Sequence, residues 1–500
     1  MTKSIAIIGA GIAGLATGCY ARMNGYDTRI FEMHDKAGGL CTAWQRHGYT
    51  VDGCIHWLVG SAPGQSYHDM WLELGAVQGR EFVDHEIFAR VEGRQGETFN
   101  VYTNLDRLER HMKDLSPADT EPIDDFINIA KTCAKYDMPM PGAPEVVEAS
   151  AGLARMALYG PFIRMMAKWR SVTISEFATR FADPFMREAF TQILIMDVPE
   201  MPVVTAGMTL GWMHNKTAGQ PVGGSLEFAR SIERRYLELG GTIQYRAPVR
   251  EVVIEDNRAV GVRLANGDVH RADTVVSAAD GHSTIYEMLG GRYVDDTVRS
   301  YYSDLHTFAP MVHVALGVAR TFENEPVVVN IPLNSPVTLG GVRVSRLPVE
   351  FLAHDPTMAP RGKTVLRLML RTDYDYWKRA SREPKDYADA KEAVAAMIVS
   401  ALNEKYKGFA DQVEMRDVAT PLSFERYTGN WRGNWGGWLI TEKTIASFHM
   451  QKTLPGLDRF YMVGQWVEPG GGVPSVALSG RQLVEILCHR DGKKFATSVP

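Results

Sequence analysis

The 500-residue chain contains few cysteines, and none of them lie in an arrangement that known chemistry uses. No C-x-x-C pair is present, and no spacing typical of metal ligands appears. The five thiols are Cys19, Cys41, Cys54, Cys133 and Cys488. A scattered odd number of cysteines is typical of reduced thiols in the cytoplasm. We therefore expect neither a disulfide framework nor a metal site.

Long hydrophobic runs are also missing. No uninterrupted apolar stretch approaches the roughly 20 residues needed to span a bilayer. The first apolar run, Ile5 to Ile8, passes directly into a glycine turn and lacks the features of a secretory signal. We expect a cytoplasmic protein that contacts a membrane, if at all, on one face.

The chain has no excess of positive charge. Its 54 Lys and Arg residues are outnumbered by 59 Asp and Glu residues, and the formal net charge is -5. Such a chain has no global field to hold a phosphate backbone, so nucleic acid is not an expected partner. Hydrophobic residues make up 45% and charged residues 23%, which is ordinary globular usage, and the length suits two or more domains.

The N-terminus carries a strand, a glycine loop and a helical pattern in that order. Ser4 to Ile8 is an apolar run typical of a buried parallel strand, and Gly9-Ala10-Gly11-Ile12-Ala13-Gly14 follows it. Gly9 suits a tight turn, Gly11 a close approach to a pyrophosphate, and Gly14 close packing of helix on strand. The helix N-terminus would hold the phosphates. The pattern predicts a dinucleotide site.

A second strand, Thr28 to Phe31, ends at Glu32, 21 residues after Gly11. A carboxylate there accepts ribose hydroxyls and repels an NADP-type phosphate. We expect Glu32 and the adjacent Met33 to contact the adenosine half of the cofactor.

A second glycine pair decides between FAD and NAD. Lys36-Ala37-Gly38-Gly39, followed by Leu40, resembles the extension found after the acidic residue in FAD-binding oxidoreductases of the amine oxidase and phytoene desaturase superfamily. The resemblance implies FAD, with these residues at the cofactor.

The far end of the chain repeats the strand, glycine loop and helix order. A probable strand from Phe460 to Val463 leads to Gly464-Gln465, then to Pro469 through Ser475, and a helix from about Val476 to Leu487. The run containing Gly472, Val473 and Pro474 resembles the C-terminal FAD motif of carotenoid desaturases. Its helix N-terminus would point toward negative charge on the cofactor.

A third segment, mid-chain, is rich in strands. Val249 to Ile254, Val260 to Leu264 and Thr274 to Ser277 are strand-like runs, two of them separated by the hairpin signal Asn266-Gly267. In the resembled family the equivalent of Val252 contacts adenine through its backbone, and the strand ending near Ala279 returns to the FAD sheet. The side chain of Val252 reads equally well as a buried strand residue.

The loop from Gly39 to Gly60 narrows the resemblance. Its Tyr49 to Gly53 step and its Ile55-His56-Trp57 continuation look like the phytoene desaturase, carotenoid isomerase and retinol saturase group. This chain departs from the group by having Gly53 one place earlier than usual.

The fold class that follows is α/β, with a discontinuous, glutathione reductase-like Rossmann-type FAD domain and a mixed α+β substrate domain. We expect FAD-binding segments at 1–84, 216–294 and 421–500. The segment 85–215 should be a largely helical lid. The segment 295–420 should supply strands such as Met311 to Val318, Pro326 to Ile331 and Thr364 to Leu370.

Chemistry on a C–C or C=C bond also moves a proton, so an acid/base group is needed beside the flavin. His56 is the candidate, because it follows the loop that passes the flavin in relatives and can act in both directions near neutral pH. The resemblance also implies that His56 contacts the cofactor. A hydrogen-bonded structural histidine is an equal alternative. Glu468 is a second candidate, although a solvated carboxylate is the simpler interpretation.

Aromatic residues near the C-terminus admit two interpretations. Trp431, Trp435 and Trp438 would wall an apolar tunnel or simply belong to the core. An aromatic cage for amines would have a similar sequence, which keeps an amine oxidase as an alternative. Met196, Met201, Met208 and Met213 would add flexible lining to a substrate cavity or fill core.

Around residue 165 the chain is basic and apolar. Phe162, Met165, Met166 and Trp169 share one helical face, flanked by Arg155, Arg164, Lys168 and Arg170. Such a helix lies on an anionic membrane or packs in the substrate domain.

We expect an FAD-dependent oxidoreductase that exchanges hydride between flavin N5 and a lipophilic substrate such as a polyene, isoprenoid, retinoid or unsaturated acyl chain. Saturase and desaturase activity are the leading expectations. A redox-neutral isomerase, an amine oxidase and a prenyl or lipid carrier are the alternatives. The electron partner stays open among quinone, oxygen, a reductase and NAD(P)H, as does the oligomeric state.

Overall fold

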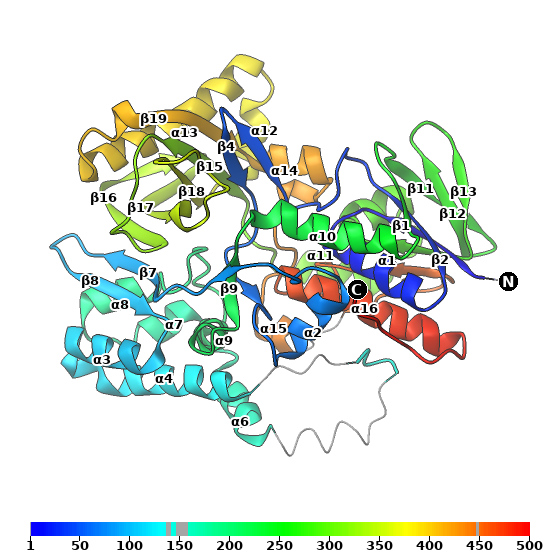
Figure 1. The fold of residues 1–500 in the computed structure, drawn as a ribbon, viewed down its shortest axis with the longest axis horizontal. Coiled ribbons are helices and arrows are strands. Elements are labelled where there is room, and N and C mark those ends of the chain that lie inside the picture. Colours follow the sequence, from blue (N-terminus) through cyan, green and yellow to red (C-terminus); the bar gives the residue numbers. More distant parts are fainter. Residues whose placement is uncertain (1, 137–141, 147–158, 447–449) are drawn as a thin grey trace.

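The computed structural model describes residues 2–136, 142–146, 159–446 and 450–500. Within it the chain forms a dinucleotide-type domain, at the right of Figure 1, and a second domain built around a large mixed sheet, at the left. The five cysteines are unpaired. No helix in the described parts is both long and apolar enough to cross a membrane.

The dinucleotide domain is centred on a parallel five-stranded sheet in the order β10-β2-β1-β14-β20. Its strands are β1 (Ser4–Ile8), β2 (Asp27–Phe31), β10 (Thr242–Gln244), β14 (Thr274–Ser277) and β20 (Phe460–Met462). Central strands of such a sheet are covered on both faces, so they are short apolar runs, and β14 is buried at every position. The sheet joins three separated parts of the chain, as expected for a discontinuous domain.

Three helices pack beside this sheet. Helix α1 (Ile12–Met23) contacts both α10 (Gly224–Glu238) and α16 (Val473–Arg490). Helix α16 begins three residues earlier than expected, because Pro474 stands in its first turn. Proline is favourable there since its missing N–H has no intrahelical partner and its φ suits a helix.

A three-stranded antiparallel sheet projects from the domain at the far right of Figure 1. It contains β11 (Val249–Glu255), β12 (Arg258–Leu264) and β13 (Val269–Arg271). The expected hairpin lies between β12 and β13, where Gly267 has φ +97°, a backbone conformation that favours glycine.

The second domain contains a seven-stranded sheet in the order β19-β15-β18-β17-β16-β7-β8. Its strands are β7 (Ile87–Glu92), β8 (Thr98–Tyr102), β15 (Met311–Val318), β16 (Val328–Leu339), β17 (Val342–Phe351), β18 (Thr364–Arg371) and β19 (Val413–Ala419). The pairing of β16 with β7 is parallel and brings Val329 opposite Arg90. The two chain segments expected to handle substrate therefore share one sheet.

Helices complete the second domain. One face of the molecule, at the lower left of Figure 1, is formed by α3 (Leu105–Leu115), α4 (Thr120–Lys135), α6 (Gly160–Trp169), α7 (Ile174–Ala178), α8 (Pro184–Phe190) and α9 (Val203–His214). Helices α12 (Tyr374–Ala380) and α13 (Pro384–Lys405) lie over the upper part of the large sheet. The sequence did not predict strands β7 and β8 within residues 85–215.

Shorter elements connect the two domains. They are β3 (Ala43–Arg46), β4 (Tyr49–Asp52), β5 (Leu58–Val59), α2 (Ser66–Glu73), β6 (Phe82–Val83), β9 (Ala218–Pro221), α11 (Asp296–Asp304), α14 (Pro421–Thr428) and α15 (Glu442–Ala446). Chain from the first 60 residues thus crosses between the domains, and Thr50 in β4 donates its N–H to Met358.

Candidate active site

A cavity of about 1440 Å³ lies at the carboxyl ends of the parallel strands, and we call it the dinucleotide cavity. Parallel sheets bind ligands at this edge, where helix N-termini and loops converge. Segments far apart in the sequence line it together: the loop after β1, the end of β2, the chain after β14 and the glycine run before α16.

The first glycine loop has the geometry that its sequence predicts. Gly9 has φ +94°. A Cβ on Gly14 would lie 2.0 Å from the Gly9 carbonyl oxygen, whereas a Cβ on Gly11 would meet nothing within 4 Å. Gly14 therefore permits close packing of α1, and Gly11 faces the open cavity. Because no side chain caps α1, its first N–H groups are available to an anionic group.

Glu32 is held in place by the same loop. Its Oε2 accepts the Ala10 N–H at 2.7 Å, and its Oε1 accepts the His34 N–H at 2.8 Å. Each carboxylate oxygen keeps a further lone pair, so both can still accept a ribose hydroxyl. The carboxylate is buried but lines the cavity.

Most of the residues predicted to bind the cofactor line the dinucleotide cavity. They are Gly9, Gly11, Ile12, Ala13, Glu32, Met33, Gly38, Gly39, Leu40, Ala279, Gly464, Gln465, Gly472 and Val473. Ala10 and Gly14 do not line the cavity. Ala10 donates its N–H to Glu32, and Gly14 packs against the Gly9 carbonyl.

Four further predicted residues lie elsewhere, among them His56, which does not line this cavity. Val252 is fully buried in β11, while Pro248 and Val249 line the cavity instead. Lys36 lines a neighbouring cleft, where its Nζ donates to the Ala43 carbonyl at 2.8 Å. Pro474 lines a second, apolar cavity.

Two lining residues were missed because no local motif announces them. Trp466 is almost fully buried, and its Nε1 has no hydrogen-bond partner among the described residues, so it has a donor available for a ligand. Asp280 accepts the N–H groups of Ser283 and Trp431. Burial raises the pKa of Asp280 to about 6, against the effect of these hydrogen bonds.

The second cavity has a volume of about 1480 Å³, and we call it the apolar cavity. It is continuous in its lining with the dinucleotide cavity at Leu40, Cys54, Trp435, Gly472 and Val473. No Asp, Glu, Lys or Arg is among the described residues that line it.

The methionines expected beside the substrate divide between two cavities. Met196, Met201 and Met208 line the apolar cavity, and Met213 lines a smaller one behind it. Flexible thioether side chains adapt to irregular ligands, so this lining is suited to a lipophilic molecule.

The three predicted tryptophans have different environments. Trp435 lines both large cavities. Trp438 is fully buried and packs edge-on against Trp466, with ring centroids 5.0 Å apart, while Trp431 stacks on His282. Only Trp435 is thus placed to wall a tunnel, and the other two belong to the core.

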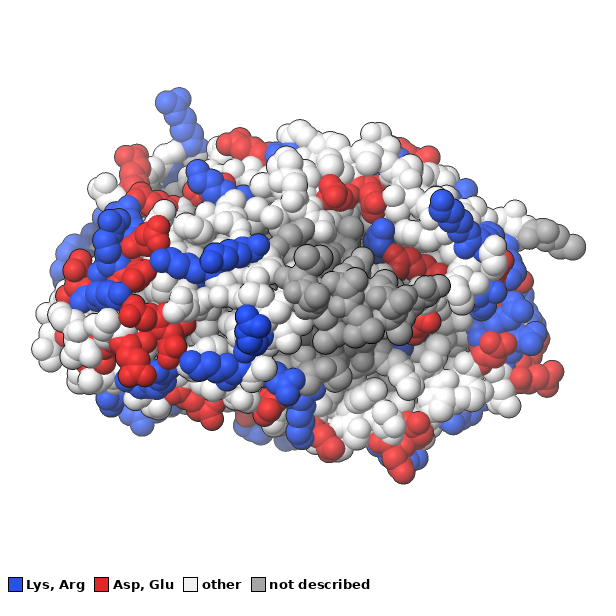
Figure 2. Space-filling model, turned by 90° about the horizontal axis from the view of Figure 1, so that it is seen from below, with Lys and Arg blue, Asp and Glu red and all other residues white. Residues whose placement is uncertain are grey.

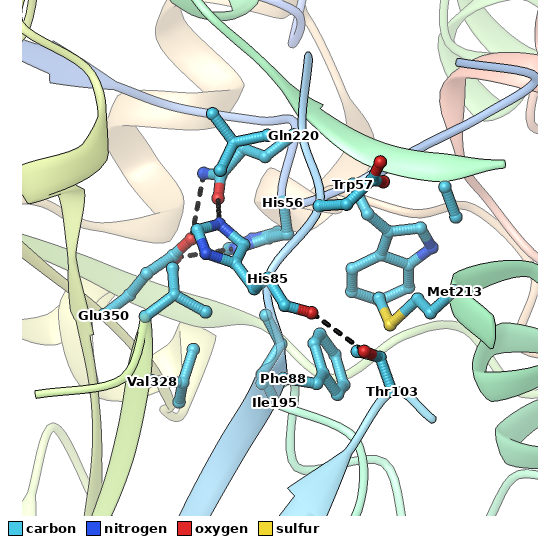
Figure 3. Close-up of a pocket in the computed structure, with 14 residues that line it drawn as sticks. His56, Trp57, His85, Phe88, Thr103, Ile195, Met213, Gln220, Val328 and Glu350 are labelled. Carbon is cyan, nitrogen blue, oxygen red and sulfur yellow. Dashed lines mark hydrogen bonds and ion pairs between the residues drawn. The ribbon is translucent and has the colours of Figure 1, made fainter. Parts of the chain in front are cut away.

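His56 lies in the wall between the apolar cavity and the smaller cavity behind it. Figure 3 shows the smaller cavity, with His56, Gln220 and Glu350 converging on one side. The His56 Nδ1 is 2.9 Å from Glu350 Oε2, and Gln220 Nε2 donates to Glu350 Oε1 at 3.3 Å. His85 in turn contacts Gln220 Oε1 at 3.1 Å.

Arg367 holds Glu350 through two hydrogen bonds, Nε to Oε2 at 2.8 Å and Nη2 to Oε1 at 2.9 Å. Its Nη1 donates to Asp52 at 2.8 Å. Arg367 Nη2 also lies 2.9 Å from His56 Nδ1, but a single nitrogen cannot both accept there and donate to Glu350. Because the two hydrogens of Arg367 Nη2 have other acceptors, Glu350 Oε1 and the Ile55 carbonyl at 3.3 Å, we assign the Nδ1 proton to the His56–Glu350 hydrogen bond.

The charged groups Glu350, Arg367 and Asp52 of this network are buried. Burial opposes ionisation of Glu350, but Arg367 and then His56 hold the pKa of that carboxyl well below its ordinary value. An ionised carboxylate fixes Nδ1–H of the imidazole, which leaves Nε2 as the nitrogen available for proton exchange. Glu350 and Arg367 were missed because they belong to β17 and β18, about 300 residues from His56.

The second acid/base candidate lies in a different setting from the one expected. Glu468 is not a solvated carboxylate: it is buried, and its Oε1 is 2.9 Å from Lys452 Nζ. The sequence interpretation is wrong here because the partner lysine, on the chain before β20, is brought to it only by the fold. Glu468 lines none of the cavities described above.

The apolar face of α6 packs on protein. Met165 and Trp169 are buried, and Phe162 and Met166 contact the same core. Lys168 lies 3.4 Å from Asp125. Figure 2 shows Lys and Arg side chains interspersed with Asp and Glu over this side of the molecule. Of the two interpretations of this face, packing against protein is the one observed. Arg155 lies outside the described residues. Membrane contact stays a prediction.

The chain is similar to known proteins over nearly its whole length. The family model of flavin containing amine oxidoreductases matches residues 12–487. A chloroplastic prolycopene isomerase of Daucus carota is 25% identical over 95% of this chain and 78% of its own length. A lycopene-forming phytoene desaturase of Pseudescherichia vulneris is 24% identical over 97% of this chain and 99% of its own.

A solved structure shares the fold. An oxidoreductase from Methanosarcina mazei superposes with a TM-score of 0.63 at 16% identity, covering 96% of this chain and 100% of that one. The resemblance inferred from the glycine motifs is confirmed at the level of the superfamily. The chain belongs to the family of flavin containing amine oxidoreductases and is a flavin-dependent oxidoreductase.

Proposed function

We propose that this enzyme binds FAD and acts on a C=C or C–C bond of a lipophilic substrate, most directly as a saturase or desaturase. The observation that carries the proposal is the apolar cavity, which meets the dinucleotide cavity and has no charged side chain among its described lining residues. A polyene, isoprenoid, retinoid or unsaturated acyl chain satisfies such a wall, because it needs no charge partner there.

FAD is favoured over FMN because the cavity has a site for each half of a dinucleotide. Glu32 suits the adenosine ribose and α1 suits the pyrophosphate. Gly472 lines both cavities at their junction, where an isoalloxazine ring would face substrate.

A bound flavin supplies hydride exchange at N5. The chain itself must position the substrate carbon, exclude water and move a proton. Leu40, Cys54 and Trp435 line the junction of the two cavities and so restrict the substrate's position there. With water displaced from this apolar wall, proton exchange with His56 Nε2 becomes the available route.

Glu350 gives His56 its orientation in this proposal. The buried carboxylate accepts Nδ1–H, fixes the orientation of the ring, and is itself held by Arg367. Loss of Glu350 would leave the buried Arg367 with Asp52 as its remaining carboxylate, and loss of Arg367 would leave the buried Glu350 with His56 alone.

Two alternatives make different predictions. A redox-neutral isomerase is favoured by the similarity to prolycopene isomerases, and it would return the flavin to its starting redox state after each turnover. An amine oxidase would have to hold a cationic or polar amine, and the absence of a carboxylate from the described lining of the apolar cavity argues against it.

Quinone, oxygen, a reductase and NAD(P)H can each exchange electrons with a flavin, and the proposal does not choose among them.

The proposed function is tested by the anaerobic absorbance of the purified protein. The protein is first titrated with NADH or NADPH, then chemically reduced and offered retinoid, carotenoid and unsaturated fatty-acid candidates. Reoxidation of reduced flavin by an alkene supports a saturase.

Other outcomes assign other activities. Bleaching of oxidised flavin by a saturated chain assigns desaturation, and bleaching by an amine overturns the proposal in favour of an oxidase. Isomerised product without net change in flavin absorbance assigns the isomerase. A protein that purifies without flavin and takes up none would be a carrier, and the proposal would fall.

A further inference from the structure

A third large cavity, of about 1650 Å³, lies between the two domains, and we call it the interdomain cleft. One wall comes from the chain between β2 and β4, including Lys36 and Trp44. The opposite wall comes from β19, α13 and α14, including Lys391 and Arg426. Glu32, Lys36, Gly39 and Leu40 of this lining belong to the predicted cofactor motifs, whereas its wall from β19, α13 and α14 has no part in the proposed reaction.

The cleft opens onto both cavities already described. It shares Leu40, Gly53 and Phe424 with the apolar cavity. It also shares Leu40 and Thr428 with the dinucleotide cavity. The cleft and the apolar cavity are therefore adjacent, with Leu40, Gly53 and Phe424 between them.

Each acidic side chain that lines the cleft has a hydrogen-bond or ion-pair partner. Glu32 accepts two backbone N–H groups, and Asp417 lies 3.0 Å from Arg46. No other Asp or Glu is among the described residues of the lining.

Three lining cations have no such partner. Lys36, Lys391 and Arg426 form no ion pair with a carboxylate of the described chain. Lys391 lies over the Tyr387 ring and Arg426 over the Tyr427 ring, at 5.6 and 5.4 Å from the centroids. Burial lowers the pKa of Lys36, with Asp35 opposing that effect.

The charge of the cleft is therefore opposite to that of the whole protein, which carries a net -5. Uncompensated cations in a concave site focus their field and favour an anion there. The apolar cavity next to it bears no charge at all among its described lining residues. The two together suit one molecule with an anionic end and a long apolar part.

We propose that the interdomain cleft binds the anionic head group of an amphiphilic substrate, a carboxylate or phosphate, while its unsaturated chain occupies the apolar cavity. This assignment rests on the proposed function, because it narrows the lipophilic substrate to an anionic one. Lys391 and Arg426 would pair with the head group, and the chain would pass Leu40 and Phe424 to reach the flavin.

The experiment compares matched probes on the flavin-loaded protein. Parinaric acid, a conjugated tetraene, quenches tryptophan fluorescence when it binds near the cavity tryptophans Trp57, Trp212 and Trp435. Its methyl ester has the same chain without the charge. Geranylgeranyl diphosphate and geranylgeraniol, used as competitors, form the second pair and distinguish a phosphate head from a carboxylate.

We expect at least one anionic member to bind roughly tenfold more tightly than its neutral counterpart, as for a charge-assisted hydrogen bond. The Lys391→Gln/Arg426→Gln variant should lose this preference and keep its affinity for the neutral member. The control Arg382→Gln/Lys385→Gln, which changes exposed cations outside the cleft lining, should retain the preference.

Several results would overturn the assignment. Equal binding of charged and neutral members, or a preference that survives in the cleft variant, removes the head-group site while the apolar cavity keeps its proposed role. Failure of every probe to bind removes the proposed lipid function as well. If the cleft variant slows flavin reduction by NADPH and keeps the probe preference, the cleft belongs to a dinucleotide donor.

Discussion

At the scale of single residues, the most consequential contact is between His56 and Glu350. We expect Glu350→Gln to lower the turnover rate by up to about 100-fold, because the amide no longer fixes or stabilises a protonated imidazole. It should also destabilise the fold by about 3 kcal/mol, since Arg367 loses a buried counter-charge. Substrate turnover and thermal unfolding of the flavin-loaded variant measure the two effects.

A double variant separates orientation from general damage. His56→Gln combined with Glu350→Gln should be no slower than His56→Gln alone, because the two residues act as one unit. Additive losses would contradict the assignment. Glu73→Gln is the matched control: Glu73 also pairs with an arginine, Arg481, and accepts a hydrogen bond from Tyr20, yet it lines none of the cavities.

His313 makes the native state sensitive to acid. It is fully buried, its Nε2 donates to the Asp52 carbonyl, and burial together with Arg367 lowers its pKa from 6.5 to about 4. The unfolded chain therefore takes up the proton first as pH falls. The free energy of unfolding should therefore fall by about 3 kcal/mol as the pH is lowered from 6.5 to 4.

Urea unfolding of wild type and His313→Gln across this pH range checks the prediction. Glutamine can still donate to the Asp52 carbonyl but does not titrate, so the acid-side decline should be shallower in the variant. Parallel curves for the two proteins would mean that other groups govern acid sensitivity.

At the scale of elements, the turn from β1 into α1 separates binding from folding. Gly11→Val should abolish flavin retention and destabilise the flavin-free protein less than Gly14→Ala does, because its Cβ meets only open cavity and the remaining cost is the poorer N-cap. Gly14→Ala should destabilise the flavin-free protein by about 2 kcal/mol, because its Cβ would lie 2.0 Å from the Gly9 carbonyl oxygen.

The ratio of flavin to protein absorbance, with thermal unfolding of both flavin-free variants, distinguishes these effects. Equal destabilisation by the two substitutions would show that Gly11 is needed for packing and not for the cofactor. A Gly11→Val protein that stays yellow would place the pyrophosphate away from this loop.

At the scale of the whole molecule, three separated segments meet at the dinucleotide cavity, so the cofactor should link them. We expect FAD at 100 times its Kd to stabilise the flavin-free protein by about 2.7 kcal/mol. FMN should give little of this effect, because it lacks the adenosine half that Glu32 and α1 would hold. Thermal unfolding with each nucleotide is the measurement, and equal stabilisation by FMN would contradict the assigned geometry.

Local patterns in the sequence were sufficient for the cofactor half of the protein. Strands β1 and β14, the glycine loops and Glu32 are predictable because each depends on neighbours a few residues away: apolar runs make buried strands, and glycines permit turns and close approaches. The surroundings of α6 could not be predicted from the sequence, because its apolar face suits lipid and protein equally well.

The amino-acid sequence alone therefore determined the flavin-dependent superfamily, the discontinuous parallel-sheet domain and the approximate strands around it. Only the tertiary structure decided which distant groups lie together around the cavities. It paired His56 with Glu350 and Arg367, enclosed Glu468 with Lys452, and set Lys391 and Arg426 opposite Lys36. These arrangements bring together residues up to about 390 positions apart, and no sequence periodicity predicts them, because long-range pairing depends on how whole sheets and helices pack.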